Sequence, residues 1–185
     1  MKKMNKIIYI IRHCEATGQA PDASLTEKGK EQAKKLAVFL SGKKVDRIIS
    51  SPFLRAILTV EPFAEKNNLK IETDSRLKER VLSTVSMPDW MDKLEATYTD
   101  FDLKYEGGES SKEATRRIMH VVNDLRESDA KSSIMVAHGG IISLLLHYYD
   151  KSTGFEAWRK LSNPDIYKLQ ISEDHHQLER IWLEA

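Results

Sequence analysis

Short apolar runs alternate with longer amphipathic stretches along the chain, a pattern that is typical of an α/β protein. The first run, residues 7–11, is mostly β-branched and lies between polar neighbours, which predicts a strand covered on both faces. Residues 133–137 repeat this pattern. Further strands are predicted at residues 45–49, 69–73, 166–171 and 178–183.

The amphipathic stretches predict helices between these strands. Thr26 can cap a helix that continues to residue 40, where apolar residues recur at helical spacing. Ser51 and Pro52 predict the start of a second helix, because serine is a good cap and proline suits the first helical position. Two more helices are predicted, from Ser110 or Ser111 to about residue 125 and from 139 to about 148, while residues 88–106 combine a short helical pattern with a loop.

This order of elements indicates one domain over residues 1–185 with a largely parallel central sheet. The chain contains no internal repeat, no low-complexity tract and no linker rich in Pro, Gly or Ser that would divide it. In sheets of this class, ligands bind beyond the carboxyl ends of the strands. Reactive side chains are therefore expected where the strands end.

Composition and charge narrow the class of protein further. The chain has 41% apolar and 31% charged residues and a formal net charge of +1, so we expect a globular protein with no general attraction to nucleic acid or membrane. A single cysteine, Cys14, excludes an internal disulfide and favours a reducing compartment. The run at residues 7–11 is too short for a signal-peptide core, and we expect a cytoplasmic location.

Charged side chains follow three of the predicted strands. Arg12 and His13 follow the first strand, Arg55 lies in the first turn of the helix after the second, and His138 follows residues 133–137. Arginine forks bind phosphoryl oxygens in pairs, and helix N-termini add backbone donors and a positive dipole end. The four side chains together predict a site for a phosphoryl dianion at one rim of the sheet.

A phosphoryl site with two histidines suggests covalent transfer, since a neutral imidazole nitrogen can act as a nucleophile. Arg12, Arg55 and a protonated His138 could neutralise the charge of the transition state. The leaving oxygen also needs a proton donor, and a nearby carboxyl group would serve. Glu15 and Glu79 are both candidates, and their spacing in the sequence does not choose between them.

Several short motifs occur in a fixed order between residues 7 and 140. They are RHCEATGQ, LTEKGKEQA, SSPFLRAILTV, LKER, GGES and VAHGG. These motifs resemble those of the histidine phosphatase superfamily, also called the phosphoglycerate mutase-like family, whose hallmark is Arg-His-Gly-Glu after the first strand. The chain matches that hallmark at Arg12, His13 and Glu15.

The resemblance implies a fold and a set of roles. The fold would be a three-layer α/β/α sandwich with a mostly parallel sheet and a small lid-like insertion at about residues 80–107. His13 would accept the phosphoryl group, and Arg12, Arg55 and His138 would bind it. Glu79 would act as general acid and then as base for the attacking water. The family uses no metal or other cofactor for this chemistry.

The chain departs from the family pattern at two positions. Cys14 stands where glycine is usual and is expected to shift the loop slightly or to alter the packing behind His13. Gln19 replaces a common asparagine and is expected to contact phosphate with altered reach, while Arg80 is expected to touch substrate as in the mutase branch. A cysteine-phosphatase site is not indicated, because that chemistry needs an arginine six residues after the cysteine, and residue 20 is alanine.

The modest insertion after Glu79 favours a phosphatase over a mutase, because water should reach the phosphohistidine. We therefore expect hydrolysis of small phosphomonoesters, with a small phosphorylated metabolite as partner. An acid-rich segment at residues 89–106 would discourage highly charged substrates. A phosphoglycerate mutase-type phosphotransferase and a non-catalytic module that binds phospho-ligands stay open as alternatives, and the oligomeric state is equally open.

Overall fold

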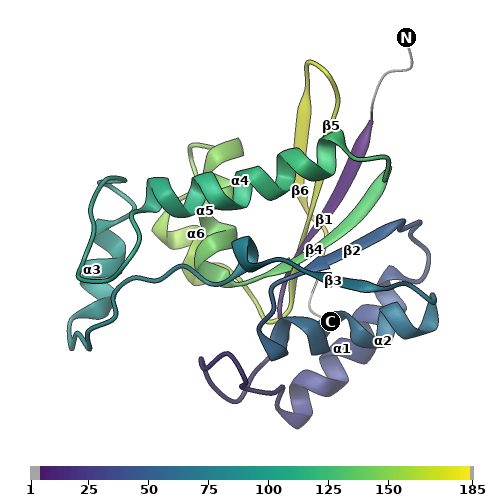
Figure 1. Ribbon diagram of the computed structural model, residues 1–185, viewed down its shortest axis with the longest axis horizontal. Coiled ribbons are helices and arrows are strands. Elements are labelled where there is room, and N and C mark those ends of the chain that lie inside the picture. The colour runs from purple at the N-terminus through teal and green to yellow at the C-terminus, as the bar shows by residue number, and fades with distance from the viewer. Residues whose placement is uncertain (1–4, 184–185) are drawn as a thin grey trace.

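A six-stranded sheet forms the centre of the computed structural model, which describes residues 5–183 (Figure 1). The strand order is β3-β2-β4-β1-β5-β6. β1, β2, β3 and β4 pair in parallel, whereas β5 runs antiparallel to both of its neighbours. The strands are β1 Lys6–Arg12, β2 Arg47–Ser50, β3 Ile71–Thr73, β4 Ser132–Ala137, β5 Asp165–Ile171 and β6 His176–Arg180.

Helices cover both faces of this sheet (Figure 1). On one face, α1 and α2 pack against the side chains of Tyr9 and Ile11. On the other face, α4 and α5 pack against Ile8 and Ile10. The helical segments are α1 Glu27–Leu40, α2 Leu54–Lys66, α3 Trp90–Ala96, α4 Ser111–Glu127, α5 Gly139–Tyr149, α6 Phe155–Lys160 and the short 3-10 helix η1 Ser75–Leu77.

The alternation along β1 explains why this strand sits at the centre of the molecule. Ile8, Ile10 and Ile11 are fully buried, and each such side chain contributes about 1.5–3 kcal/mol to stability. Because successive residues point to opposite faces, β1 is anchored in both cores at once. The expected three-layer α/β/α sandwich with a mostly parallel sheet is confirmed.

Two predicted helix starts are confirmed by their caps. Thr26 caps α1 by accepting the Gly29 N–H at 3.0 Å. Ser110 caps α4, and Ser110 and Glu113 each accept the other's backbone N–H in a capping box. Both caps satisfy donors that a helix N-terminus otherwise leaves unpaired.

The predicted start of the second helix is wrong. α2 begins at Leu54, with Phe53 at the cap position, instead of at Ser51 and Pro52. The Ser51 N–H continues the sheet by donating to the Val136 carbonyl, and the Ser51 hydroxyl lies against His138. Ser51 is thus held by the neighbouring strand and by the site.

Two features at the end of the chain also differ from the prediction. β6 covers His176–Arg180 instead of residues 178–183, because its pairing with β5 starts at Ile171 and His176 and ends at Tyr167 and Arg180. Trp182 then packs among residues of α1 and α2, with its ring 5.3 Å from that of Phe39. The short helix α6 was not predicted.

Residues 78–110, between η1 and α4, form an excursion, a segment that leaves the body of the protein and returns to it. Its two ends lie side by side, because the backbone N–H of Glu109 donates to the Val81 carbonyl at 2.7 Å and the backbone N–H of Thr84 donates to the Glu106 carbonyl at 2.9 Å. It contains α3 and lies where the lid-like insertion is expected. In the described part of the chain, no helix has the length and apolar character needed to span a membrane.

Candidate active site

The ends of three parallel strands bring the predicted reactive residues to one rim. Arg12 at the end of β1 is in register with Ala137 at the end of β4, and Ser50 of β2 is in register with Val136. His13 and His138 therefore leave neighbouring strands together. Their ring centroids are 5.1 Å apart in an edge-to-face arrangement.

His13 is held in a single orientation by two contacts. Its Nδ1 lies 2.7 Å from the Cys14 carbonyl oxygen. A carbonyl can only accept, so Nδ1 carries the hydrogen and Nε2 keeps its lone pair. Arg55 Nε donates to that lone pair at 3.3 Å. The available nitrogen of His13 thus faces a guanidinium.

The electrostatic surroundings keep His13 neutral. Burial is the largest cause that lowers its pKa, the charges of Arg55 and Arg12 lower it as well, and the contact with the Cys14 carbonyl opposes them, so that the pKa of His13 is about 4. A neutral imidazole can attack phosphorus, whereas a protonated one cannot. His13 is therefore in its nucleophilic form throughout the neutral pH range.

Arg55 is buried in the first turn of α2, and its guanidinium ties two parts of the site together. Besides its bond to His13, Nη1 donates to the backbone carbonyls of Gln19 at 3.3 Å and Ala20 at 2.9 Å. Its guanidinium also stacks over the Phe53 ring at 5.0 Å. Arg55 thereby fixes the loop that follows β1 against the start of α2.

Arg12 is anchored from the opposite side of the site. Its Nη1 donates to the Leu161 carbonyl at 2.8 Å, and its guanidinium lies where a side chain on Gly139 would come within 3.0 Å. Only glycine permits this close approach of α5 to the arginine. Burial lowers the pKa of Arg12 and of Arg55, and the negative charge of Glu79 opposes this change in both.

The surroundings of His138 disfavour the protonated form that was considered from the sequence. Burial lowers the pKa of His138 most, and the neighbouring His13, Arg55 and Arg12 lower it as well, so that this pKa falls to about 2. Its Nε2 lies 2.8 Å from the Ser51 hydroxyl. Its buried Nδ1 and the buried Nε of Arg12 have no hydrogen-bond partner within residues 5–183.

The structure separates the two candidate acids. The Glu15 carboxylate accepts from the Thr26 hydroxyl at 2.9 Å and pairs with Lys28 at 3.6 Å, so it belongs to the start of α1. The Glu79 carboxylate instead lies at the start of α5, where it accepts from the backbone N–H groups of Gly140 and Ile141, each at 2.9 Å.

A third backbone donor, the N–H of Arg80, lies 2.7 Å from Glu79 Oε1. The N-terminus of a helix stabilises a negative charge through its free donors and its dipole. Of the two candidate acids, Glu79 is the one whose negative charge acts on Arg12 and Arg55, in the direction that raises the pKa of both.

Arg80 and Gln19 make contacts of their own within the protein. The buried Arg80 guanidinium donates to Thr97 at 3.2 Å, to Ser111 at 3.0 Å and to the Glu109 carbonyl at 3.1 Å. It therefore fastens the excursion to α4. The Gln19 side chain is exposed, and it is the backbone carbonyl of Gln19 that meets Arg55.

Cys14 fills a small buried cluster with Leu25 and Ala33. Burial raises the pKa of its thiol to about 12. The Cys14 N–H donates to the Thr59 hydroxyl at 2.8 Å, and its carbonyl holds His13. Cys14 thus acts on the site through its backbone.

Sequence reasoning missed several residues that support the reactive groups. Asn163 donates its side-chain amide to the His13 carbonyl at 2.9 Å. Thr59, Ser51 and the Leu161 carbonyl hold Cys14, His138 and Arg12 as described above. Asn163 and Leu161 lie about 150 positions along the chain from the groups they bind, so no local pattern could have indicated them.

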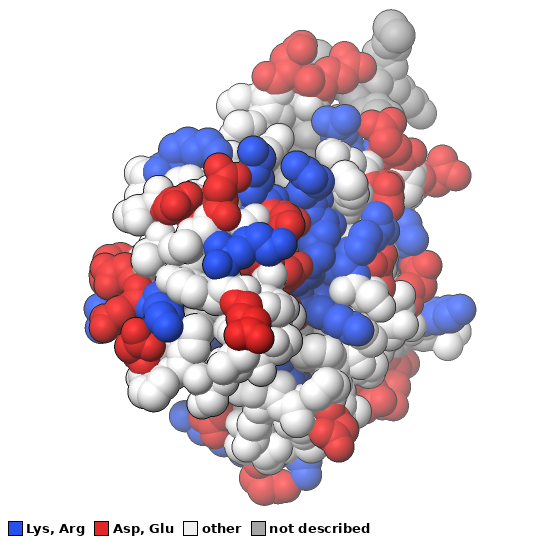
Figure 2. All heavy atoms as spheres, turned by 60° about the vertical axis from the view of Figure 1, so that its left-hand side comes forward, with Lys and Arg blue, Asp and Glu red and all other residues white. Residues whose placement is uncertain are grey.

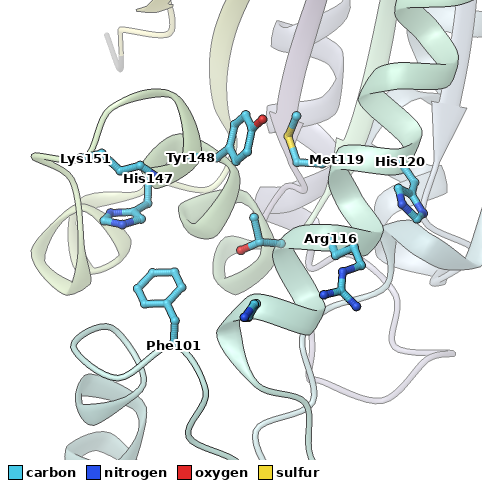
Figure 3. Close-up of a pocket in the computed structure, with 9 residues that line it drawn as sticks. Phe101, Arg116, Met119, His120, His147, Tyr148 and Lys151 are labelled. Atoms are coloured by element: carbon cyan, nitrogen blue, oxygen red, sulfur yellow. The ribbon is translucent and has the colours of Figure 1, made fainter.

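Neither metal-ligand clusters nor the surface cavity in Figure 3 mark this rim. In the described residues no group of three or more His, Cys, Asp or Glu could hold a metal ion. The cavity, of about 340 Å³, lies between α4, the end of α5 and the loop at Phe101, and none of its lining residues is a predicted site residue. On the face shown in Figure 2, basic side chains gather near the middle with acidic ones among them, so no broad field of one sign covers that face.

Comparisons with known proteins agree with the geometry. The profile of the histidine phosphatase superfamily, branch 1, matches residues 8–183. A putative phosphoserine phosphatase 2 of Hydrogenobacter thermophilus is 27% identical over 157 residues, which cover 76% of this chain and 77% of that protein. A probable phosphoglycerate mutase of Shigella dysenteriae is 28% identical over 198 residues, covering 96% of this chain and 88% of that protein.

A solved structure shares the fold. It is a mycobacterial glucosyl-3-phosphoglycerate phosphatase in complex with inorganic phosphate, with a TM-score of 0.75 and 24% identity. The match covers 97% of each chain. The arrangement of sheet and helices is therefore common to both proteins.

Proposed function

The chain belongs to the histidine phosphatase superfamily, and on this premise we propose that it hydrolyses small phosphomonoesters through a phosphohistidine on His13. One observation carries the proposal. The neutral His13 has its Nε2 lone pair directed at the buried Arg55, in a site with a second, partly buried arginine, Arg12. A nucleophilic nitrogen beside two guanidiniums suits attack on a phosphoryl group.

The first step transfers the phosphoryl group to His13. The phosphate oxygens take the place of the His13 lone pair as acceptors for Arg55, and the unpartnered Nε of Arg12 gives them a further donor. The Nε2 lone pair forms the bond to phosphorus while the bond to the leaving oxygen breaks. Glu79 gives its proton to that oxygen, which leaves as the alcohol.

The second step returns the enzyme to its starting state. Water attacks the phosphorus, the bond to Nε2 breaks, and Glu79 takes the proton of the water. Inorganic phosphate is released. The proton that Glu79 gives in the first step is thus recovered from water in the second, and the carboxyl group is ready for another turnover.

The charges of the site fit a phosphoryl dianion. Arg12 and Arg55 supply two positive charges, and the neutral His138 can offer its buried Nδ1 to an oxygen. These groups are positioned before substrate arrives, so they need little rearrangement in the transition state. We propose no metal in these steps, because the two guanidiniums serve as the electrophilic groups.

Small monoesters are the substrates that we propose. The acid-rich segment at residues 89–106, which follows Glu79 in the chain, disfavours highly charged molecules. A putative phosphoserine phosphatase and a glucosyl-3-phosphoglycerate phosphatase are among the similar proteins named above. Gln19 remains a candidate contact for the phosphate, whereas Arg80 is proposed to hold the excursion in place.

The test is turnover of p-nitrophenyl phosphate in the presence of excess chelator. We expect chelator-resistant hydrolysis that is lost in His13→Ala. No turnover over a broad panel of monophosphates, with phosphate binding intact, would instead indicate a non-catalytic module. Because one relative is a probable phosphoglycerate mutase, formation of 2-phosphoglycerate from 3-phosphoglycerate at a rate above that of hydrolysis would favour the mutase alternative.

A further inference from the structure

We propose that Arg117 and Glu109 form a clamp that positions Glu79 for proton transfer. Both lie outside the set of reactive residues, Arg117 on α4 and Glu109 just before it. The inference rests on the proposed function, in which Glu79 is the general acid and base. Neither side chain of the clamp touches the Glu79 carboxylate, so each acts as a positioning residue.

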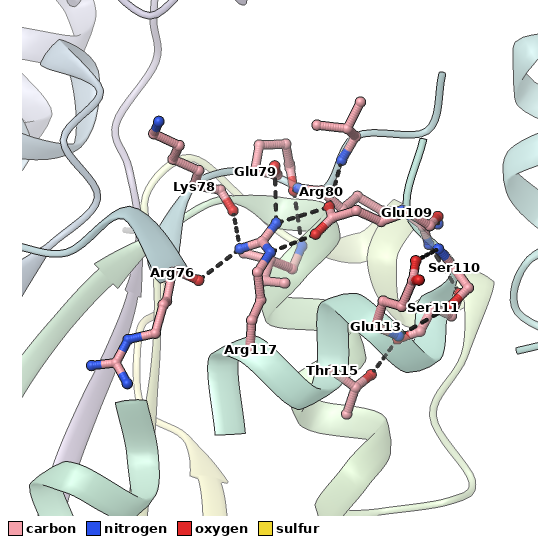
Figure 4. Close-up of polar contacts among 12 residues, drawn as sticks. Arg76, Lys78, Glu79, Arg80, Glu109, Ser110, Ser111, Glu113, Thr115 and Arg117 are labelled. Atoms are coloured by element: carbon pink, nitrogen blue, oxygen red, sulfur yellow. Dashed lines mark hydrogen bonds and ion pairs between the residues drawn. The ribbon is translucent and has the colours of Figure 1, made fainter. Parts of the chain in front are cut away.

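Arg117 holds the backbone on which Glu79 is carried (Figure 4). Its Nη1 donates to the carbonyls of Arg76 at 2.6 Å and Lys78 at 2.8 Å. Its Nη2 donates to the carbonyl of Glu79 itself at 3.2 Å. Three carbonyls of the segment that leads into Glu79 thus converge on one guanidinium.

Glu109 completes the clamp from the other side. Its carboxylate binds Arg117 through two bonds, from Nε to Oε1 at 2.6 Å and from Nη2 to Oε2 at 3.0 Å. The same Oε2 accepts the N–H of Val81 at 2.9 Å. Residues on both sides of the Glu79 side chain are therefore tied to one ion pair.

Arginine is required here by its geometry. A guanidinium has five N–H donors in one plane, and the five bonds described above use all of them. Lysine carries its three donors on a single nitrogen and cannot span the same acceptors. The side chains of Arg117 and Glu109 are only 21% and 23% exposed, so the pair is largely shielded from water.

The clamp and the start of α5 hold Glu79 at its two ends. The clamp fixes the backbone, and the N–H groups of Gly140 and Ile141 fix the carboxylate. A general acid loses efficiency when it moves out of hydrogen-bond reach of the leaving oxygen. Loss of the clamp should therefore impair proton transfer while leaving His13, Arg12 and Arg55 in place.

This role predicts a dependence on the leaving group. p-Nitrophenolate leaves without much help from an acid, whereas an alkoxide needs a proton. In Arg117→Ala and Glu109→Gln, the rate of the first step with ethyl phosphate is expected to fall about 100-fold, and the first step with p-nitrophenyl phosphate less than about 10-fold. Water attack on the phosphohistidine also needs Glu79, so a burst of p-nitrophenol should precede slow turnover.

The experiment compares pre-steady-state rates for both substrates in several variants. Arg116→Ala is the matched control, because Arg116 is an exposed neighbour on the same helix and should leave the ratio between the two substrates unchanged. Glu109→Gln keeps the size of the side chain, and Arg117→Lys keeps the charge, so both remain informative if Arg117→Ala does not fold. We expect Arg117→Lys to recover at most part of the rate that Arg117→Ala loses.

A double variant decides whether the clamp acts through Glu79. Arg117→Ala combined with Glu79→Gln should be no slower than Glu79→Gln alone with ethyl phosphate. The clamp would be overturned if the rate losses of the two single variants multiply in the double variant, or if Arg117→Ala slows both substrates equally. Either result would leave the proposed function intact. A Glu79→Gln variant with no preference for p-nitrophenyl phosphate would instead overturn the acid role of Glu79, and the clamp with it.

Discussion

At His13, one backbone contact decides which nitrogen can react. The Cys14 carbonyl accepts a hydrogen bond from Nδ1–H, so the lone pair is on Nε2, which faces Arg55. Asn163 holds the His13 carbonyl from the far end of the chain. The nucleophile therefore depends on residues that do not themselves react.

Cys14 gives a prediction at the scale of a single residue. Cys14→Gly should retain kcat with p-nitrophenyl phosphate within about 3-fold, because the contacts of Cys14 with Thr59 and His13 come from its backbone. It should also lower the free energy of unfolding by about 1–2 kcal/mol through lost packing and added chain entropy. Steady-state kinetics and denaturant unfolding measure the two effects.

A loss of kcat beyond 10-fold in Cys14→Gly would show that the thiol itself takes part in the reaction. The native thiol should also resist a water-soluble disulfide reagent and react fully after denaturation, because it is buried and burial raises its pKa to about 12.

Sequence motifs identify the residues that meet at the proposed site but not all of their states. Arg12, His13, Arg55 and His138 are brought together as expected, because strand ends and helix starts are local features. Spacing in the sequence left Glu15 and Glu79 open and only the family resemblance favoured Glu79, whereas the fold places Glu15 at α1 and Glu79 at α5. The neutral form of His138 also needed the fold, since it follows from burial beside other basic groups.

At the scale of elements, the start of α5 serves as the seat for Glu79. Gly139 and Gly140 open this helix, and each allows a site residue to approach its backbone. A Cβ on Gly140 would lie 2.7 Å from Glu79 Oε1 and 3.0 Å from Arg80 Cγ. The pair of glycines after His138 is therefore a requirement of the geometry.

We predict that Gly140→Ala lowers kcat with p-nitrophenyl phosphate by about 10-fold or more, because the added methyl displaces the Glu79 carboxylate. The free energy of unfolding should fall by about 1–3 kcal/mol as the neighbours shift. Gly42→Ala is the control, since a side chain there meets nothing within 4 Å. Wild-type kinetics in Gly140→Ala would mean that Glu79 does not sit on α5 during turnover.

Most elements could be predicted from apolar periodicity, whereas several boundaries could not. The strands β1 and β4 have strong apolar runs, and the helices α1 and α4 have strong helical patterns and clear caps. All four lie where expected. α2 starts later than predicted because the Ser51 N–H donates to the Val136 carbonyl and the Ser51 hydroxyl contacts His138. Both partners are distant in sequence. α6 is short and packs Phe155 against Tyr98, a contact that its own sequence does not reveal.

At the scale of the whole molecule, the buried histidines link stability to pH. The pKa of His13 is lowered to about 4 in the folded protein, against 6.5 for a free side chain. As the pH falls below 6.5, the unfolded chain binds a proton that folded His13 does not, so stability is lost on acidification. Between pH 7.5 and pH 4.5 this costs about 2 kcal/mol for His13.

Urea unfolding of the wild type and of His13→Asn at these two pH values tests this relation. We expect the loss of stability on acidification to be smaller in the variant by about 2 kcal/mol, because the titrating group is gone. Subtraction of the two proteins cancels the carboxylates that they share. Equal losses in both would show that folded His13 titrates as it does in the unfolded chain.

Both faces of the sheet contribute to a single site at its rim. The α1 and α2 layer supplies Arg55 and supports Cys14, while the α4 and α5 layer supplies the seat and the proposed clamp of Glu79. The central strands β1 and β4 deliver the two histidines between them. This division explains why the catalytic proposal draws on residues from most of the chain.

The most direct test of the account is to locate the phosphoryl group during turnover. Glu79→Gln, which should slow water attack, is mixed with p-nitrophenyl phosphate, quenched in alkali, digested and analysed by mass spectrometry. The account predicts one phosphate on His13 that is stable in base, lost in acid and absent from His13→Ala. Phosphate on another residue, or turnover with no phosphoprotein in either the wild type or the variant, would contradict it.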